Sequence, residues 1–165
     1  MMSDLVEQTL TRLDSAVSPE DFDDLLWVAA DLIRKVSMRN FRAGVDWVDR
    51  EEVTTADAEH LKSALVRALN RSSDPRLTGS VLFALGCSFD RQYLEVYRRL
   101  LAEHLEALKA HNAVVFAALI ALDNVGEPVF ERNPDGTSSQ GLTHVEENVR
   151  QAQEYLRTLG IVHPW

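Results

Sequence analysis

The chain has 165 residues, of which 45% are hydrophobic and 26% are charged, and its formal net charge is -9. This composition excludes disordered and fibrous classes, and the length is sufficient for one domain with a buried core. Because an acidic chain repels phosphate backbones and anionic lipids, we expect no direct binding to nucleic acid and none to a membrane. The single cysteine, Cys87, excludes an internal disulfide and a zinc site built on cysteines.

The sequence has no segment typical of membrane insertion or export. Its longest apolar run, residues 113–122, is half of the roughly 20 residues that a membrane-spanning helix needs. The N-terminal residues contain early acidic side chains and lack the apolar core of a secretory signal. We therefore expect a soluble protein that works in the cytoplasm.

Helical periodicity runs through nearly the whole chain, and no stretch alternates convincingly in the way that a strand does. Ser3 is expected to cap a first helix. Ser18 is expected to cap a second, because Pro19 follows it and Asp21 lies three residues beyond it. From residue 37 to 54 the pattern lapses, which predicts a loop or a broken helix.

The helical pattern then resumes. Thr55 is the expected cap of a third helix, and Asp74 with Pro75 begins a fourth that is apolar almost all round. Three more helices are expected: Asp90 to Leu108, a cap at Asn112 followed by a helix to Asn124, and a last helix with an apolar stripe of Val145, Val149, Ala152, Leu156 and Leu159 before a left-handed Gly160. Residues 125–141, with an Asn-Pro-Asp-Gly turn, are expected to form a loop.

The sequence contains a weak internal repeat. "VLFALG" at 81–86 matches "ALIALD" at 118–123 with an offset of 37 residues, and a longer amphipathic helix precedes each segment. A two-helix unit of this length is typical of solenoid repeats, in which each hairpin buries its apolar face by stacking on its neighbours.

The segment "DPRLTGSVLFALG", residues 74–86, resembles the second helix of HEAT-like (armadillo-type) repeats. The likeness is weaker over "HNAVVFAALIALDNVG" and only generic in the first 60 residues. It implies an all-α fold, a right-handed stack of antiparallel helix pairs with about three repeats and a C-terminal capping helix, in a single domain covering residues 1–165. A four-helix bundle with additions is the alternative architecture.

Most of the negative charge lies in the N-terminal third of the chain. Residues 1–60 contain 14 acidic and 6 basic side chains, whereas the remainder is nearly balanced. In the second helix, one narrow stripe contains Glu20, Asp24, Trp27 and Asp31. The opposite face supplies the core residues Phe22, Leu25, Leu26, Ala29, Leu32, Ile33 and Val36.

A second acidic group surrounds Trp47 in "DWVDREE". Its members are Asp46, Trp47, Asp49, Glu51 and Glu52. Aromatic rings framed by carboxylates are typical of protein interfaces, so both groups predict binding to a protein with a basic surface. The structural alternative is that Trp27 packs against the 37–54 segment and that Trp47 holds this segment in place.

No residue pattern indicates catalysis. The paired His-Glu dipeptides of HEAT-like metal-dependent hydroxylases are absent, and the acidic chain lacks the basic groove of HEAT-like DNA glycosylases. Asp57 with His60, and His144 with Glu147, have a spacing that suits two metal ligands but arises readily by chance. His104 is expected to be a hydrogen-bonded core histidine and Cys87 a packed thiol. We predict no enzymatic activity, no cofactor and no bound metal.

In general character the chain resembles immunity or antitoxin proteins, which cover a toxin through complementary charge. This resemblance implies a basic toxin, such as a nuclease, as the partner. A generic HEAT-like scaffold or adaptor and a degenerate HEAT-like enzyme are the alternatives.

Overall fold

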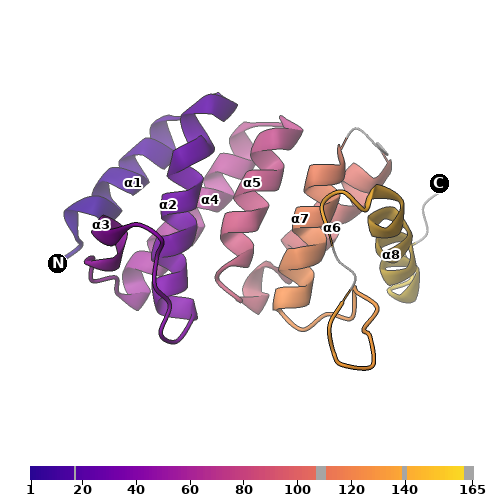
Figure 1. The fold of residues 1–165 in the computed structure, drawn as a ribbon. Helices are drawn as coiled ribbons and strands as arrows, with labels where there is room; N and C mark the ends of the chain where they lie inside the picture. Colours follow the sequence, from indigo (N-terminus) through magenta and orange to yellow (C-terminus); the bar gives the residue numbers. More distant parts are fainter. Residues whose placement is uncertain (17, 107–110, 139–140, 162–165) are drawn as a thin grey trace. The chain divides into compact units, whose positions relative to one another are not determined.

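The structure, a computed structural model, describes residues 1–16, 18–106, 111–138 and 141–161. Within these ranges the chain is helical, and its only β pairing is an isolated bridge between Arg132 and Ser138. The helices are α1 (Asp4–Ser15), α2 (Pro19–Ser37), α3 (Asp46–Asp49), α4 (Thr55–Arg71), α5 (Pro75–Gly86), the 3-10 helix η1 (Arg91–Tyr93), α6 (Leu94–Glu106), α7 (Asn112–Asn124) and α8 (Val145–Thr158). Figure 1 labels the α-helices. The all-α fold class is confirmed for the described residues.

The chain divides into two compact units, an N-terminal unit of Met1–Ser88 and a C-terminal unit of Phe89–Trp165. The N-terminal unit contains α1 to α5, and the C-terminal unit contains η1 and α6 to α8. None of the helices in the described ranges combines the length and apolar character needed to cross a lipid bilayer. The prediction of a single domain over residues 1–165 stays a prediction.

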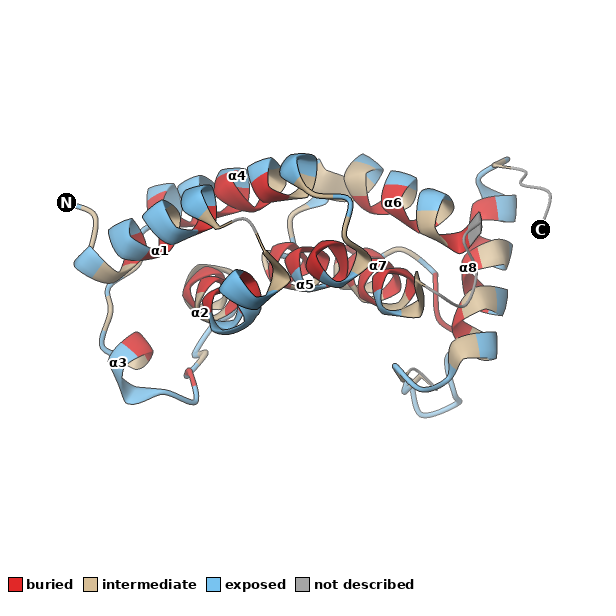
Figure 2. Ribbon diagram, turned by 90° about the horizontal axis from the view of Figure 1, so that it is seen from above, coloured by how far each residue is buried: buried red, intermediate tan, exposed pale blue. Residues whose placement is uncertain are grey.

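The N-terminal unit is built from two helix pairs. Helix α1 packs on α2 and α4 on α5, while α1 also lies beside α4 and α2 beside α5. Seen from above in Figure 2, α1 and α4 form one layer and α2 and α5 the other, with the buried residues turned toward the space between them. This arrangement leaves the outer faces of α2 and α5 available to solvent.

Side-chain caps define where the helices of the N-terminal unit begin. The hydroxyl of Ser3 accepts from the backbone N–H of Val6 at 3.3 Å. The Asp21 carboxylate accepts from the Ser18 backbone N–H at 3.1 Å, so the predicted cap of α2 is confirmed. The predicted cap of α4 is wrong by one residue, because Thr54, and not Thr55, forms a capping box with Asp57.

In the C-terminal unit, α7 packs against both α6 and α8. Two predicted boundaries are corrected here. Asn112 is the first residue of α7, and the capping position is that of His111. The helix expected from Asp90 to Leu108 begins instead with η1 and is described as α6 only to Glu106, so Leu108 lies outside the described residues.

The buried face of α8 differs from the predicted apolar stripe. Ala152 and Leu156 are buried as predicted, but Val145 and Val149 are only half-buried and Leu159 is exposed. Three polar or aromatic residues complete the buried face: Asn148, Gln151 and Tyr155. Hydrogen bonds accompany the burial of the two polar side chains. Asn148 donates to the carbonyl of Gly141, and the Gln151 side chain accepts from the Glu131 N–H.

The predicted loop after α7 is confirmed over its described part. Gly136 has the positive φ of 85° that the Asn-Pro-Asp-Gly turn requires, and its N–H donates to the carbonyl of Asn133. Val129 and Phe130 are buried and anchor the segment to the unit. Gly160, after α8, also has the predicted left-handed conformation, with a φ of 75°.

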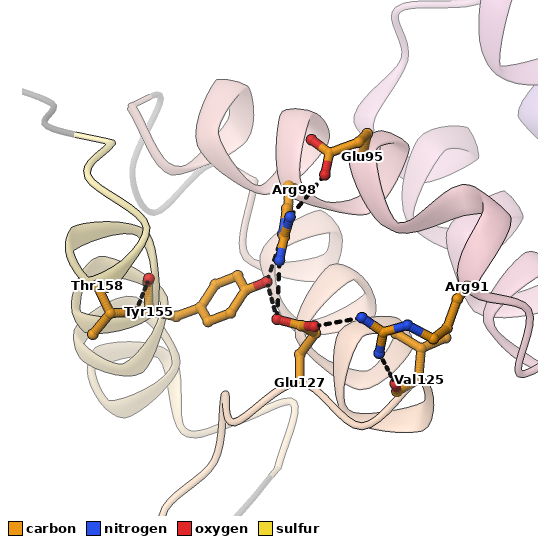
Figure 3. A network of polar contacts seen from close by, with 7 residues as sticks. All are labelled: Arg91, Glu95, Arg98, Val125, Glu127, Tyr155 and Thr158. Carbon is orange, nitrogen blue, oxygen red and sulfur yellow. Dashed lines mark hydrogen bonds and ion pairs between the residues drawn. The ribbon is translucent and has the colours of Figure 1, made fainter.

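Figure 3 shows a polar network that joins α6, α8 and the residues after α7. Glu127 is central: its carboxylate accepts from the Tyr155 hydroxyl at 2.8 Å, from Arg98 at 3.2 Å and from Arg91 at 3.1 Å. Burial opposes ionisation of Glu127, but the hydrogen bonds from Tyr155, Arg91 and Arg98 outweigh it and hold the pKa of this carboxyl below its ordinary value. Burial raises the pKa of Tyr155 to about 12, which keeps its hydroxyl a donor.

Candidate functional site

The α2 stripe, which comprises Glu20, Asp24, Trp27 and Asp31, lies on the outer face of α2. The Trp27 side chain is 60% exposed, Glu20 and Asp24 are exposed, and Asp31 is half-buried. On the opposite face, all of the predicted core residues except the half-buried Val36 are buried. The helical pattern therefore placed the tryptophan correctly, on the side away from the core.

Trp27 rests on Phe83 of helix α5. The two ring centres are 5.2 Å apart and their planes are inclined by 62°, which is an edge-to-face arrangement. A contact of this geometry fixes the position of the indole and covers only part of it. The alternative drawn from the sequence placed Trp27 against the 37–54 segment. Among the described residues its ring contact is instead with Phe83 of α5, and more than half of the residue is exposed.

Arg34 extends the stripe by another turn and was missing from the sequence-based prediction. Its guanidinium lies 5.2 Å from the ring centre of Phe83 and 5.7 Å from that of Phe41, and it donates to Asp31 at 3.1 Å. Arg34 follows Trp27 by seven residues, which is about two helical turns, so the sequence itself indicated that both residues lie on the same face of α2. Phe41 and Phe83 gave no comparable signal, because their place depends on how segments pack.

Helices α2 and α5 run in the same direction along this face. Glu20 lies beside Arg76, with their charged atoms 3.9 Å apart, and Trp27 lies beside Phe83. Both pairs are separated by 56 residues in the chain, so seven residues along α2 correspond to seven along α5. The α2 stripe therefore has a matching row on α5, and the two rows together form the surface.

An acidic hollow adjoins the N-terminal end of the stripe. It has a volume of about 630 Å³ and is lined by Arg12, Ser15, Ala16, Glu20, Asp21, Asp23 and Asp24. Glu20 and Asp24 belong to both the hollow and the stripe. Within the described part of the chain, no basic side chain forms an ion pair with Asp23 or Asp24. Charge on this side is thus left for solvent or for a partner.

The second predicted group, the α3 cluster of Asp46, Trp47, Asp49, Glu51 and Glu52, is held by main-chain contacts. The Lys35 ammonium donates to the carbonyl oxygens of Val48 at 2.9 Å and of Asp49 at 2.7 Å, and also to that of Glu51. The Asp49 carboxylate in turn accepts from the backbone N–H of Ala43. These bonds tie α3 to the end of α2.

Trp47 is 49% exposed, whereas its neighbour Val48 is fully buried and, with Lys35, anchors α3. The alternative drawn from the sequence, in which Trp47 holds this segment in place, stays a prediction. Asp46 and Glu52 are exposed, while Asp49 and Glu51 are half-buried. No hydrogen bond, ion pair or ring contact within the described ranges joins the α3 cluster to the α2 stripe.

The acid of each candidate metal pair has other partners. Asp57 is buried and completes the cap of α4, while Glu147 accepts from Arg150 and Gln151. No group of three or more His, Cys, Asp or Glu side chains comes together among the described residues in a way that suits a metal ion.

Cys87 is a packed thiol as predicted, whereas the predicted core placement of His104 is wrong, because this residue is only half-buried. The Nδ1 atom of His104 lies 2.8 Å from that of His111. Burial and the neighbouring His111 lower the pKa of His104. The Cys87 thiol is 4% exposed and donates to the Phe83 carbonyl at 3.2 Å, and burial raises its pKa against the opposing charge of Arg34.

Comparison of the chain with protein-family models, with curated proteins and with solved structures gave no significant match. The candidate site therefore depends on its own geometry: an exposed tryptophan seated on Phe83 and flanked by carboxylates.

Proposed function

We propose that this protein is a non-catalytic binding module that recognises a protein with a basic surface through the α2 stripe. The observation that carries the proposal is Trp27, a large ring that is 60% exposed between Asp24 and Asp31 and fixed by Phe83. A tryptophan in this setting can supply most of the binding energy, and the surrounding carboxylates supply steering and register.

The surface is also suited to binding because it is already ordered. Trp27 is held by its contact with Phe83, and Arg34 is held by Asp31 and by the same Phe83 ring. Side chains that are fixed before association lose less conformational entropy when a partner binds. The α3 cluster, fixed by Lys35, offers a second exposed tryptophan to the same partner.

The proposed architecture is a HEAT-like right-handed stack of antiparallel helix pairs. Its support is the pairing of α1 with α2 and of α4 with α5 in the N-terminal unit. Helix α5 begins 56 residues after α2, whereas α7 begins 37 residues after α5. The 38–54 segment accounts for most of this difference, which is what an insertion into the first of several repeats produces.

The proposed biological role is that of an immunity or antitoxin protein that neutralises a basic toxin, such as a nuclease, in the cytoplasm. An acidic surface with an aromatic anchor matches the charge of such a toxin. A gene for an immunity protein lies beside the gene for its toxin, so the protein encoded by the neighbouring gene is the candidate partner to test. A neighbour without a basic domain favours the scaffold or adaptor alternative.

The test uses the double variant Asp24→Lys with Trp27→Ala, in the full chain and against the basic protein encoded by the neighbouring gene. We expect the affinity to fall by about 100-fold or more, because an anchor is lost and a like charge is introduced. Isothermal titration calorimetry measures the affinity, and circular dichroism checks that helicity is unchanged.

The matched control is Glu146→Lys with Leu142→Ala. It makes the same charge change and also removes an exposed apolar side chain, but in the C-terminal unit. It should bind as the unmodified protein does. Undiminished binding by the Asp24→Lys and Trp27→Ala variant contradicts the proposal.

A further inference from the structure

The surface around the α2 stripe already holds one guanidinium group, that of Arg34. An aromatic ring lies against it, 5.2 Å from Cζ to the centre of Phe83, and a carboxylate three residues earlier in the helix accepts from it at 3.1 Å. A ring face and a nearby carboxylate are the two elements that bind a guanidinium best. The protein thus contains an internal example of arginine recognition on this face.

Trp27 and Asp24 supply a ring and a carboxylate of the same kind, and no cation among the described residues lies over the Trp27 ring. Asp24 precedes Trp27 by three residues, so the carboxylate and the ring lie on one face about one helical turn apart. Phe83 meets the indole at an inclination of 62° and leaves 60% of the side chain exposed. An open ring beside an acid with no ion pair in the described part of the chain offers a guanidinium the same two groups that contact Arg34.

Three basic side chains near the stripe do not fill this position. Arg12 lines the adjoining hollow with Glu20 and Asp24, but within the described part of the chain it forms no ion pair with Asp24. Arg34 is held by Asp31 and by two rings. Arg76 approaches Glu20 only to 3.9 Å, and these two side chains are 68% and 71% exposed. An ion pair this exposed contributes little, so the charge of a partner can replace Arg76 with small loss.

We propose that Trp27 and Asp24 bind an arginine side chain of the partner, with Glu20 adding negative charge from the preceding turn. This inference rests on the proposed function and deepens it by naming the side chain that is recognised. Arginine fits better than lysine, because a planar guanidinium stacks on an indole while it donates two parallel hydrogen bonds to a carboxylate. An ammonium group is a strongly hydrated point charge and cannot do both.

The experiment compares two peptide probes of equal length and charge, Ac-(Arg-Gly)4-NH2 and Ac-(Lys-Gly)4-NH2, at low ionic strength. The full-length chain carries Trp47→Phe and Trp165→Phe, so that Trp27 is the only tryptophan and its fluorescence reports occupancy of the site. We expect the arginine peptide to bind about two- to fivefold more tightly, which corresponds to one exposed cation–π contact.

Three further variants separate the ring from the charge, with binding followed by calorimetry. Trp27→Leu should remove the preference for arginine and leave the affinity for the lysine peptide unchanged, while Trp27→Phe should keep part of the preference. Asp24→Asn should weaken binding of both peptides. Circular dichroism confirms that each variant retains its helices.

Equal binding of the two peptides by the parent chain, or an arginine preference that survives Trp27→Leu, overturns the arginine site. So does the absence of binding by either peptide. None of these results affects the proposed function, which is decided by the folded basic partner and the Asp24→Lys with Trp27→Ala variant. If the Asp24→Lys with Trp27→Ala variant binds the basic partner undiminished, the proposed function is wrong, and a measured preference for the arginine peptide is not affected by that outcome.

Discussion

Lys35 shows how one side chain determines which of its neighbours are exposed. Its ammonium group donates to the carbonyls of Val48, Asp49 and Glu51, at the end of the short helix α3. A cation at the C-terminus of a helix satisfies carbonyl groups that have no helical partner. Val48 is therefore turned into the protein and Trp47 outward, into solvent.

We expect Lys35→Met to release the 38–54 segment, because methionine keeps an apolar stem but donates no hydrogen bond. The free energy of unfolding should fall by about 1–3 kcal/mol, the range for bonds to a charged group. Urea denaturation measures this loss, and hydrogen exchange at residues 43–52 locates it. Trp47→Ala is the matched control and should leave both readings nearly unchanged; a larger loss for Trp47→Ala would show that the ring is the anchor after all.

Contacts of single residues also explain why the sequence-based prediction of the α4 cap was wrong by one residue. Thr54 and Thr55 are adjacent, and either can cap a helix by residue type alone. The structure selects Thr54 because Asp57, three residues later, completes a reciprocal pair of hydrogen bonds. A capping box was readable from the sequence, whereas the short α3 was not, since its formation depends on the distant Lys35.

At the scale of elements, the network around Glu127 holds α6, α8 and the segment after α7 together. The Glu127 side chain is 12% exposed and Arg98 is 21% exposed, so both charges lie largely out of water. Removing one partner leaves the other poorly solvated. Because the pKa of Glu127 is held below its ordinary value of 4.5, its ionised form stabilises the fold above pH 4.5. This contribution is lost as the pH falls through the lower, folded-state pKa.

Glu127→Gln should therefore destabilise the protein by about 1–3 kcal/mol at pH 7, because the variant keeps the shape but loses the charge. The difference from the unmodified protein should shrink as the pH falls below about 4.5. Urea denaturation at several pH values measures it. Glu154→Gln, which disrupts the exposed pair with Arg157, is the control and should show little change at any pH. A difference for Glu127→Gln that is independent of pH would contradict the role of its charge.

At this scale the sequence predicted well which segments form helices, but it predicted poorly which side chains contact one another. Periodicity and start signals placed every long helix, because each of these helices has an apolar face that must be buried. The stripe of α8 was shifted because hydropathy counts Asn148, Gln151 and Tyr155 as poor core residues. They are buried through hydrogen bonds to α6 and the 125–144 segment, and no local pattern contains that information.

At the scale of the whole molecule, charge is distributed unevenly along the chain. Residues 1–60 carry most of the negative charge, and they supply both the α2 stripe and the α3 cluster. A field of one sign over a binding surface raises the rate of encounter with an oppositely charged partner. Salt screens this field, with a Debye length of about 10 Å at 0.1 M.

We expect the association rate with the basic partner to fall by about tenfold or more between 20 mM and 300 mM NaCl, with a much smaller change in the dissociation rate. Stopped-flow fluorescence measures both rates. The charge-reversed pair Asp24→Lys with Glu20→Lys should weaken the salt dependence, whereas Glu146→Lys should not. An association rate that does not respond to salt would rule out steering by the acidic surface.

The candidate site could be predicted only in part. Amphipathic geometry located Trp27 and its carboxylates, since a helix determines the relation of residues three and four apart. Phe83 and Phe41, which order the surface, come from other segments and required the tertiary structure. The internal role of Asp49 and the exposure of Trp47 likewise depended on how α3 is held.

Cys87 gives this surface a built-in chemical reporter. It is the only thiol in the chain, and it is 4% exposed and bonded to the carbonyl of Phe83, the residue whose ring carries Trp27 and Arg34. A buried thiol reacts with an alkylating reagent only when the structure around it opens. The rate at which Cys87 of the native protein is alkylated therefore measures how often this end of α5 opens. It reports the mobility of the aromatic surface without any added label.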